Sequence, residues 1–119
     1  FPYTTLFRSY RGDVALSYIA NKVRQGDEDG MVGLTEMDGI TVLQLKQEIN
    51  GSEYVTYIYY RDGKLWELFT DTESGLGVND GYEILECDEV AMSMDGELLS
   101  VSTSGDGGGR IWLSLRSGG

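Results

Sequence analysis

Acidic residues with part of the spacing of a calcium-binding loop follow the first predicted helix. Counted from Gln25, Asp27, Asp29 and Glu36 occupy positions 3, 5 and 12 of an EF-hand loop. An EF-hand needs a carboxylate at its first position, where this chain has Gln25, and a second helix, whereas residues 40–43 are rich in β-branched residues. We therefore favour a polar turn from helix to strand, with calcium binding by Asp27, Asp29 and Glu36 as the lesser alternative.

Side chains for acid–base or nucleophilic catalysis are scarce. The chain has no His and a single Cys, Cys87, which excludes Ser/His and Cys/His pairs and zinc sites built from several Cys or His. Carboxylate pairs such as Glu86 with Asp88 could act on a glycoside, but 20 Asp and Glu residues in 119 make close pairs an expected accident. We predict no catalytic residue, no cofactor and no enzyme, with Cys87 as a small buried residue.

Aromatic residues gather in one predicted strand and the strand that follows it. Tyr54, Tyr57 and Tyr59 lie within residues 53–60, and Trp66 lies beyond the next turn. On a solvent-facing sheet such a row could stack on sugar rings or on a protein partner. Aromatic residues are also ordinary strand residues. Tyr54, Tyr57, Tyr59 and Trp66 are therefore the candidate binding face, with sheet packing as the competing interpretation.

The charge and composition limit the class of protein. There are 9 Lys and Arg against 20 Asp and Glu, a net charge of −11, and this field repels nucleic acid. The 40% of hydrophobic residues is typical of a folded domain, and 119 residues suffice for one such domain. No apolar run approaches the roughly 20 residues that span a bilayer. The chain as given should be soluble, and membrane contact would need a preceding segment.

The N-terminal part divides into a doubtful leader and an amphipathic helix. Residues 1–9 resemble a translated sequencing adapter, so we treat them as non-native. Residues 10–26 are predicted to form the C-terminal half of a longer helix, with Gly26 as its stop. One stripe of this helix is apolar, and a second apolar pair lies on its far side. The stripe contains Leu16, Ile19, Ala20 and Val23, and the pair is Val14 with Tyr18.

Strands separated by turn dipeptides occupy residues 27–119 and form a single domain together with the helix of residues 10–26. Asp38-Gly39, Asn50-Gly51, Asp62-Gly63 and Asp95-Gly96 are pairs that favour two-residue hairpins. Strands joined by such turns are antiparallel. The expected fold is α+β, with one helix packed on an antiparallel meander of six to seven strands. The predicted strands are 31–36, 40–49, 53–60, 64–70, 82–94 with a possible break near Asp88, 97–103 and 110–116.

From residue 10 onward the chain resembles an uncharacterised bacterial domain-of-unknown-function family whose members are similar to type IV pilin and pseudopilin subunits. The resemblance lies in the helix of residues 15–25, the hairpin of residues 58–69 and the tail of residues 113–119. It implies a longer N-terminal helix whose first half is embedded in a membrane behind a short basic leader. That half and its leader are not in this sequence.

Two functions follow as expectations. The resemblance implies a membrane-anchored, non-catalytic subunit of a type IV pilus, competence or type II secretion apparatus, with its globular domain outside the cytoplasm. Its partners would be other pilin-like subunits or assembly proteins, reached through helix residues such as Val14, Leu16, Tyr18, Ile19 and Val23. The alternative is a secreted or surface binding module that holds a sugar or protein on its Tyr/Trp face.

Overall fold

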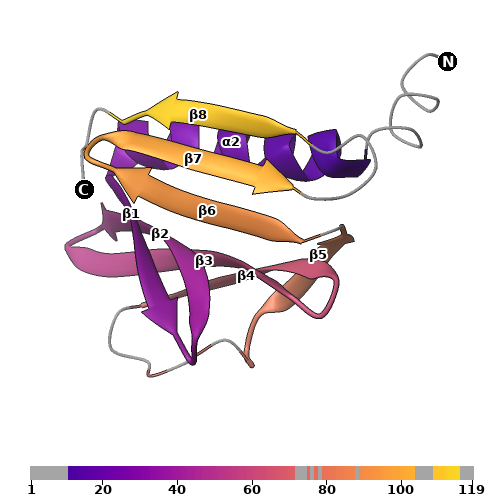
Figure 1. Cartoon of the computed structure of the whole chain (residues 1–119). Coiled ribbons are helices and arrows are strands. Elements are labelled where there is room, and N and C mark those ends of the chain that lie inside the picture. Colours follow the sequence, from indigo (N-terminus) through magenta and orange to yellow (C-terminus); the bar gives the residue numbers. More distant parts are fainter. Residues whose placement is uncertain are drawn as a thin grey trace, which may run out of the picture.

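One helix and eight antiparallel strands form the structure, a computed structural model that describes residues 11–71, 75, 77, 79–87, 89–103 and 109–115 (Figure 1). The predicted leader of residues 1–9 and the tip of the last predicted hairpin lie outside this range. The elements are α2 (Arg11–Asp29), β1 (Met31–Met37), β2 (Ile40–Ile49), β3 (Ser52–Arg61), β4 (Lys64–Asp71), β5 (Tyr82–Glu86), β6 (Val90–Asp95), β7 (Leu98–Thr103) and β8 (Arg110–Ser114).

Helix α2 runs past the glycine that was expected to end it. Gly26 lies inside the helix, and the Gly30 amide donates a hydrogen bond of 2.8 Å to its carbonyl oxygen. A Cβ atom at Gly26 would lie 3.1 Å from Leu45 Cδ2, and one at Gly30 would overlap the Lys46 carbonyl oxygen. The helix therefore ends at Asp29 because Gly30 must pass close to the β2 backbone. No helix among the described residues is long and apolar enough to cross a bilayer.

Three hairpin turns have the predicted conformation and one is shifted. Both central residues have positive φ in Asp38-Gly39, Asn50-Gly51 and Asp62-Gly63, as a type I′ turn requires. In the β6–β7 hairpin only Gly96 has positive φ, since Asp95 still belongs to β6. Glycine at the first central position is the type II′ arrangement. The central pair of this turn is thus Gly96-Glu97.

The predicted single meander is two sheets. Strands β1 to β5 form a five-stranded sheet in sequence order, and β6 to β8 form a three-stranded sheet. The predicted strand 82–94 divides into β5 and β6, which raises the strand count to eight. Cys87 and Val90 are buried on either side of this division, at 4% and 8% exposure. The chain changes sheets there because both side chains enter the common core.

The core lies where α2 meets both sheets. The helix contacts β1 and β2 of the large sheet and β7 and β8 of the small one, while β6 lies against β1 and β2. Figure 1 shows α2 behind β7 and β8, with the large sheet beside them. The core residues include Ala15, Leu16, Ile19, Val23, Val32, Leu43, Leu45, Ile58, Leu65, Leu99, Val101 and Leu115. One helix is thus shared by two sheets.

Candidate functional site

The four predicted aromatic residues do not share one face. In the strand register Tyr57 opposes Leu68 and Tyr59 opposes Trp66, and both lie an odd number of residues from Tyr54, so alternation places them on the opposite face. Tyr54 lies on the other face, because it opposes Asp71 and stacks on Phe69. Tyr57, Tyr59 and Trp66 lie together on the face away from α2. The structure therefore brings three of the four together and separates Tyr54 from them.

Tyr59 is a core residue and not part of an exposed row. Its side chain is fully buried, and it packs with Val42 in a second small cluster on this face. A Cβ atom at Gly81 would overlap its hydroxyl, so a glycine is required where the chain crosses it. Burial raises the pKa of Tyr59, and a backbone hydrogen bond from Gly81 partly opposes that shift. Tyr59 has no ring surface to offer a ligand in this conformation.

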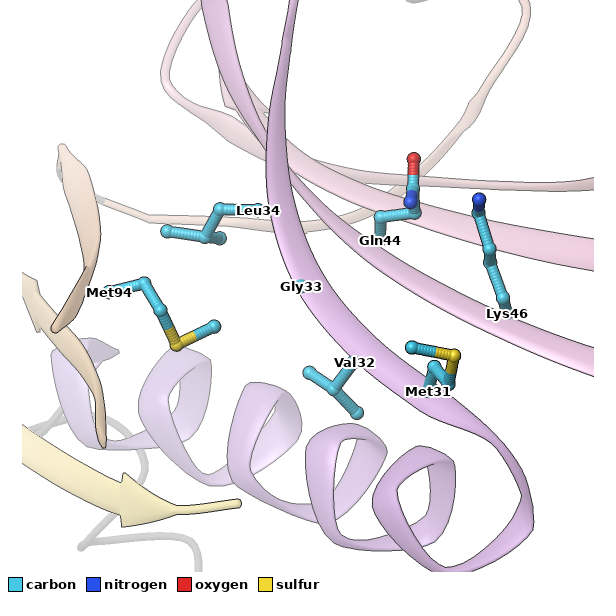
Figure 2. Close-up of a pocket in the computed structure, with 7 residues that line it drawn as sticks. All are labelled: Met31, Val32, Gly33, Leu34, Gln44, Lys46 and Met94. Carbon is cyan, nitrogen blue, oxygen red and sulfur yellow. The ribbon is translucent and has the colours of Figure 1, made fainter. Parts of the chain in front are cut away.

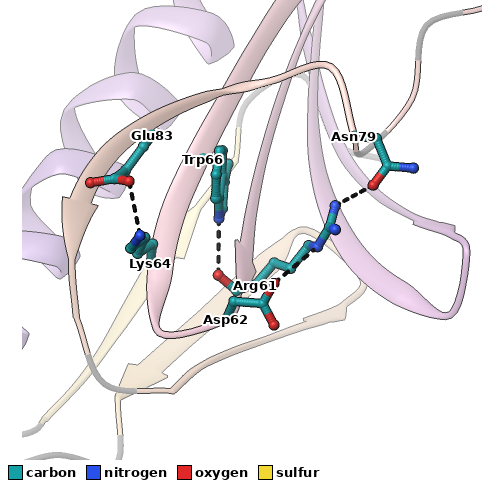
Figure 3. A network of polar contacts seen from close by, with 6 residues as sticks. All are labelled: Arg61, Asp62, Lys64, Trp66, Asn79 and Glu83. Atoms are coloured by element: carbon teal, nitrogen blue, oxygen red, sulfur yellow. Dashed lines mark hydrogen bonds and ion pairs between the residues drawn. The ribbon is translucent and has the colours of Figure 1, made fainter.

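Trp66 and the β3–β4 turn form a polar network at the same face (Figure 3). Trp66 Nε1 donates a hydrogen bond of 2.9 Å to the Arg61 carbonyl oxygen, and an Arg61 guanidinium nitrogen donates one of 2.6 Å to Asn79 Oδ1. Lys64 Nζ lies 3.1 Å from a carboxylate oxygen of Glu83. The indole N–H is thus satisfied within the chain, and Arg61 ties the segment around Asn79 to β3.

The predicted helix stripe is the seam with the sheets. Leu16, Ile19 and Val23 are exposed by 4%, 0% and 1%, and Val14 and Tyr18 are half-buried. Tyr18 was expected on the far side of the stripe, but its side chain packs against the core of its own domain. Its use in contact between subunits stays a prediction.

A polar contact joins this seam to strand β4. The Tyr18 hydroxyl donates a hydrogen bond to Glu67 Oε1, and Lys22 Nζ lies 3.2 Å from the same atom. Burial raises the pKa of Tyr18 well above its usual range, and the Glu67 carboxylate raises it further. Because one carboxylate holds two successive turns of the helix, this contact fixes the rotation of α2 on the sheet.

The calcium-like segment does not form a loop. Asp27 and Asp29 belong to the last turn of α2, and Glu36 lies within β1. Among the described residues there is no group of three Asp, Glu, Cys or His side chains placed to hold a metal ion. The Gly30 amide donates to the Gly26 carbonyl oxygen and β1 begins at Met31, so the helix passes directly into the strand.

A hollow beside the end of α2 is the feature that the sequence analysis did not single out. Phe69 lines this aromatic hollow with Lys22, Gln25, Gln47, Thr56 and Glu67, and its volume is about 190 Å³. Tyr54 stacks on Phe69, with ring centroids 5.5 Å apart and ring planes within 8°. The alternation in β4, which places Phe69 on the face of Leu65 and Glu67, is the signal that could have found it.

A second hollow lies at the free edge of β1, where only β2 pairs with that strand (Figure 2). Its volume is about 330 Å³, and its lining is mainly apolar. In Figure 2 Leu34 and Met94 point toward one another across it, and Gln44 and Lys46 lie on the other side of β1. Met31 at one end is 56% exposed. This hollow has few polar groups and no arrangement for chemistry.

The fold and these sites define a small α+β domain in which one helix packs against two antiparallel sheets. A family model matches residues 10–106, a domain of unknown function designated DUF4860. The chain belongs to this family, so the expected membership of an uncharacterised domain family is confirmed. No curated protein and no solved structure matches the chain.

Proposed function

We propose that the protein is a non-catalytic structural subunit, a minor pilin-like or pseudopilin-like component of a type IV pilus, competence or type II secretion-type apparatus. Its full-length form would be anchored in a membrane, with this domain outside the cytoplasm. Its partners would be other pilin-like subunits or the proteins that assemble them. The order of elements supports this proposal, since one N-terminal helix precedes an antiparallel sheet that it covers.

The observation that carries the proposal is the way both sheets hold the helix. Ala15, Ile19 and Val23 span two turns of α2 and are exposed by 0%, 0% and 1%. The N-terminal end of α2 lies at the periphery of the domain (Figure 1). A helix packed in this way moves with the domain as one body. Any element continuous with the helix would therefore fix the position of the whole domain.

The helix also keeps a face for contact with a neighbour. Ser17, Asn21 and Arg24 are exposed on the side away from the core, at intervals of about one helical turn. These side chains are polar or charged, and none belongs to the core. In an assembly of parallel helices this face would lie toward an adjacent subunit.

Cysteine cross-linking in the full-length protein tests the proposal. Ser17→Cys is placed on the exposed helix face in a Cys87→Ala background, and the gene is expressed with its natural upstream sequence in the source bacterium. The matched control is Ser93→Cys, an exposed position on β6. We expect membrane-associated dimers linked through residue 17 and none through residue 93. A full-length protein that is released from the membrane and remains monomeric with both variants would contradict the proposal.

A further inference from the structure

We propose that the aromatic hollow binds a neutral saccharide, with one pyranose ring stacked on Phe69. This site is separate from the helix face that the proposed subunit would use, and it does not depend on that function. The opposite face of the sheet, which carries Tyr57, Tyr59 and Trp66, is not the proposed binding site because Tyr59 is buried there. An aromatic platform, a polar lining, and the size and charge of the hollow support this binding.

An exposed, fixed aromatic ring provides the platform. Phe69 is a large apolar side chain that is 49% exposed, and it lies beyond the part of β4 that pairs with β5. The parallel stack with Tyr54 holds its ring plane, so little side-chain freedom remains to be lost on binding. The apolar C–H face of a sugar ring is a flat surface that complements such a platform.

The polar residues around the platform can both donate and accept hydrogen bonds. Gln25 and Gln47 carry carboxamides, Thr56 carries a hydroxyl, and Lys22 carries an ammonium group. Glu67 receives Tyr18 and Lys22 at one oxygen, Oε1, whereas a carboxylate can accept about four hydrogen bonds. Sugar hydroxyls are themselves donors and acceptors, so this mixed lining suits them better than it suits an apolar side chain.

The strand register explains why these groups converge. Leu45, Thr56 and Phe69 lie opposite one another on β2, β3 and β4 and form one row across the sheet. Gly26 packs on Leu45, which brings the last turns of α2 down onto this row. The helix thereby forms one wall of the hollow and Phe69, backed by Tyr54, the other.

Size and charge favour a single neutral ring. The volume of about 190 Å³ equals roughly six waters at about 30 Å³ each, below the range usual for drug-sized ligands. Lys22 is paired with Glu67 at 3.2 Å, Lys46 is a second cation in the lining, and the chain as a whole carries −11. An acidic saccharide would be repelled by that net charge. A neutral sugar avoids this cost.

Titration of the 119-residue chain with neutral oligosaccharides tests the inference. Chitotriose, cellotriose and maltotriose are added at millimolar concentrations to ¹⁵N-labelled protein, and the amide shifts are recorded. At least one of them should move the signals of Gln25, Thr56 and Phe69 together. Phe69→Ala should weaken that binding about tenfold or more, since stacking on an aromatic ring is the main contact. Phe69→Tyr should retain it.

The control is Trp112→Ala, which removes a 59% exposed aromatic side chain from β8 in the other sheet. It should leave binding unchanged. No shift with any of the three sugars would overturn the inference, as would binding that survives Phe69→Ala or that digalacturonate matches. Cross-linking of Phe69→Cys between full-length subunits would instead assign the hollow to a protein contact. None of these results bears on the cross-linking at Ser17, so the two proposals fail separately.

Discussion

The two faces of the five-stranded sheet are buried by different means. On one face Leu43 and Ile58 are fully buried beneath α2 and the small sheet. On the other face Val42 and Tyr59, their neighbours in the sequence, are equally buried but form a cluster of their own. The first face is closed by regular elements, and the second by side chains and the short segment around Asn79 and Gly81. We therefore expect substitutions on the two faces to differ in their cost to stability although the side chains are equally buried.

The largest effect is expected where the helix meets the sheet. Gly30→Ala places a Cβ atom against the Lys46 carbonyl oxygen, and backbone must move to relieve the overlap. We expect a loss of about 3 kcal/mol or more in the free energy of unfolding, measured by urea denaturation. The control is Gly33→Ala three residues further on, in β1, where an added Cβ meets nothing within 4 Å. A loss as large at Gly33 would show that close packing of the helix is not the cause.

A large but smaller loss is expected from the helix-side core. Ile58→Ala leaves a cavity among residues of the helix and both sheets, and should cost about 3 kcal/mol. Because this core is common to all elements, circular dichroism of α2 and fluorescence of the tryptophans should show one coincident transition. Two separated transitions would mean that the sheets unfold independently and that the helix does not couple them.

A local effect is expected on the opposite face. Tyr59→Phe removes the hydroxyl that lies against Gly81, at a cost of about 1 kcal/mol. Hydrogen exchange should accelerate at residues 79–81 and stay unchanged in α2. Equally faster hydrogen exchange in α2 would contradict the proposed difference between the two faces of the five-stranded sheet.

The smallest effect concerns the rotation of the helix. Tyr18→Phe removes the hydrogen bond to Glu67 and should cost roughly 1 kcal/mol at neutral pH. Because the pKa of Tyr18 is raised in the folded state, its contribution is complete below the ordinary tyrosine value of about 10. It is lost as the pH rises from there through the folded value.

The decline in stability above pH ~10 should therefore be shallower in Tyr18→Phe than in the parent chain. Tyr59, whose pKa is also raised, should keep part of the decline in that variant. Urea denaturation at a series of alkaline pH values provides the comparison. An identical decline in the two chains would show that the Tyr18 hydroxyl does not hold its proton more tightly in the folded state than in the unfolded state.

Much of the fold could be predicted because its signals are local. The Asp-Gly and Asn-Gly pairs require positive φ wherever they lie, and three of the four hairpins turn at them. The strand boundaries followed within a few residues. The break near Asp88 was foreseen, but the change of sheet was not. Local pairing patterns say nothing of which sheet a strand joins, and that choice depends on the burial of Cys87 and Val90.

The candidate site was less predictable because it depends on what covers each face. Alternation separates Tyr59 from Ile58, yet both are fully buried, so period alone does not reveal an exposed row. Glycine commonly ends a helix, so Gly26 was the expected stop. The helix instead ends before Gly30, because Gly30 lies close to the β2 backbone. Phe69 lies in an alternating strand like many others. Only its position beside Tyr54 and the end of α2 makes it part of a hollow.

Sequencing the gene upstream of residue 10 from source DNA tests whether the protein is a pilin-like subunit built on its helix. We expect a short basic leader followed by an apolar run of roughly 20 residues, the length that a bilayer requires, in helical register with Leu16, Ile19 and Val23. A cleavable secretory signal or a second soluble domain at that position would contradict it.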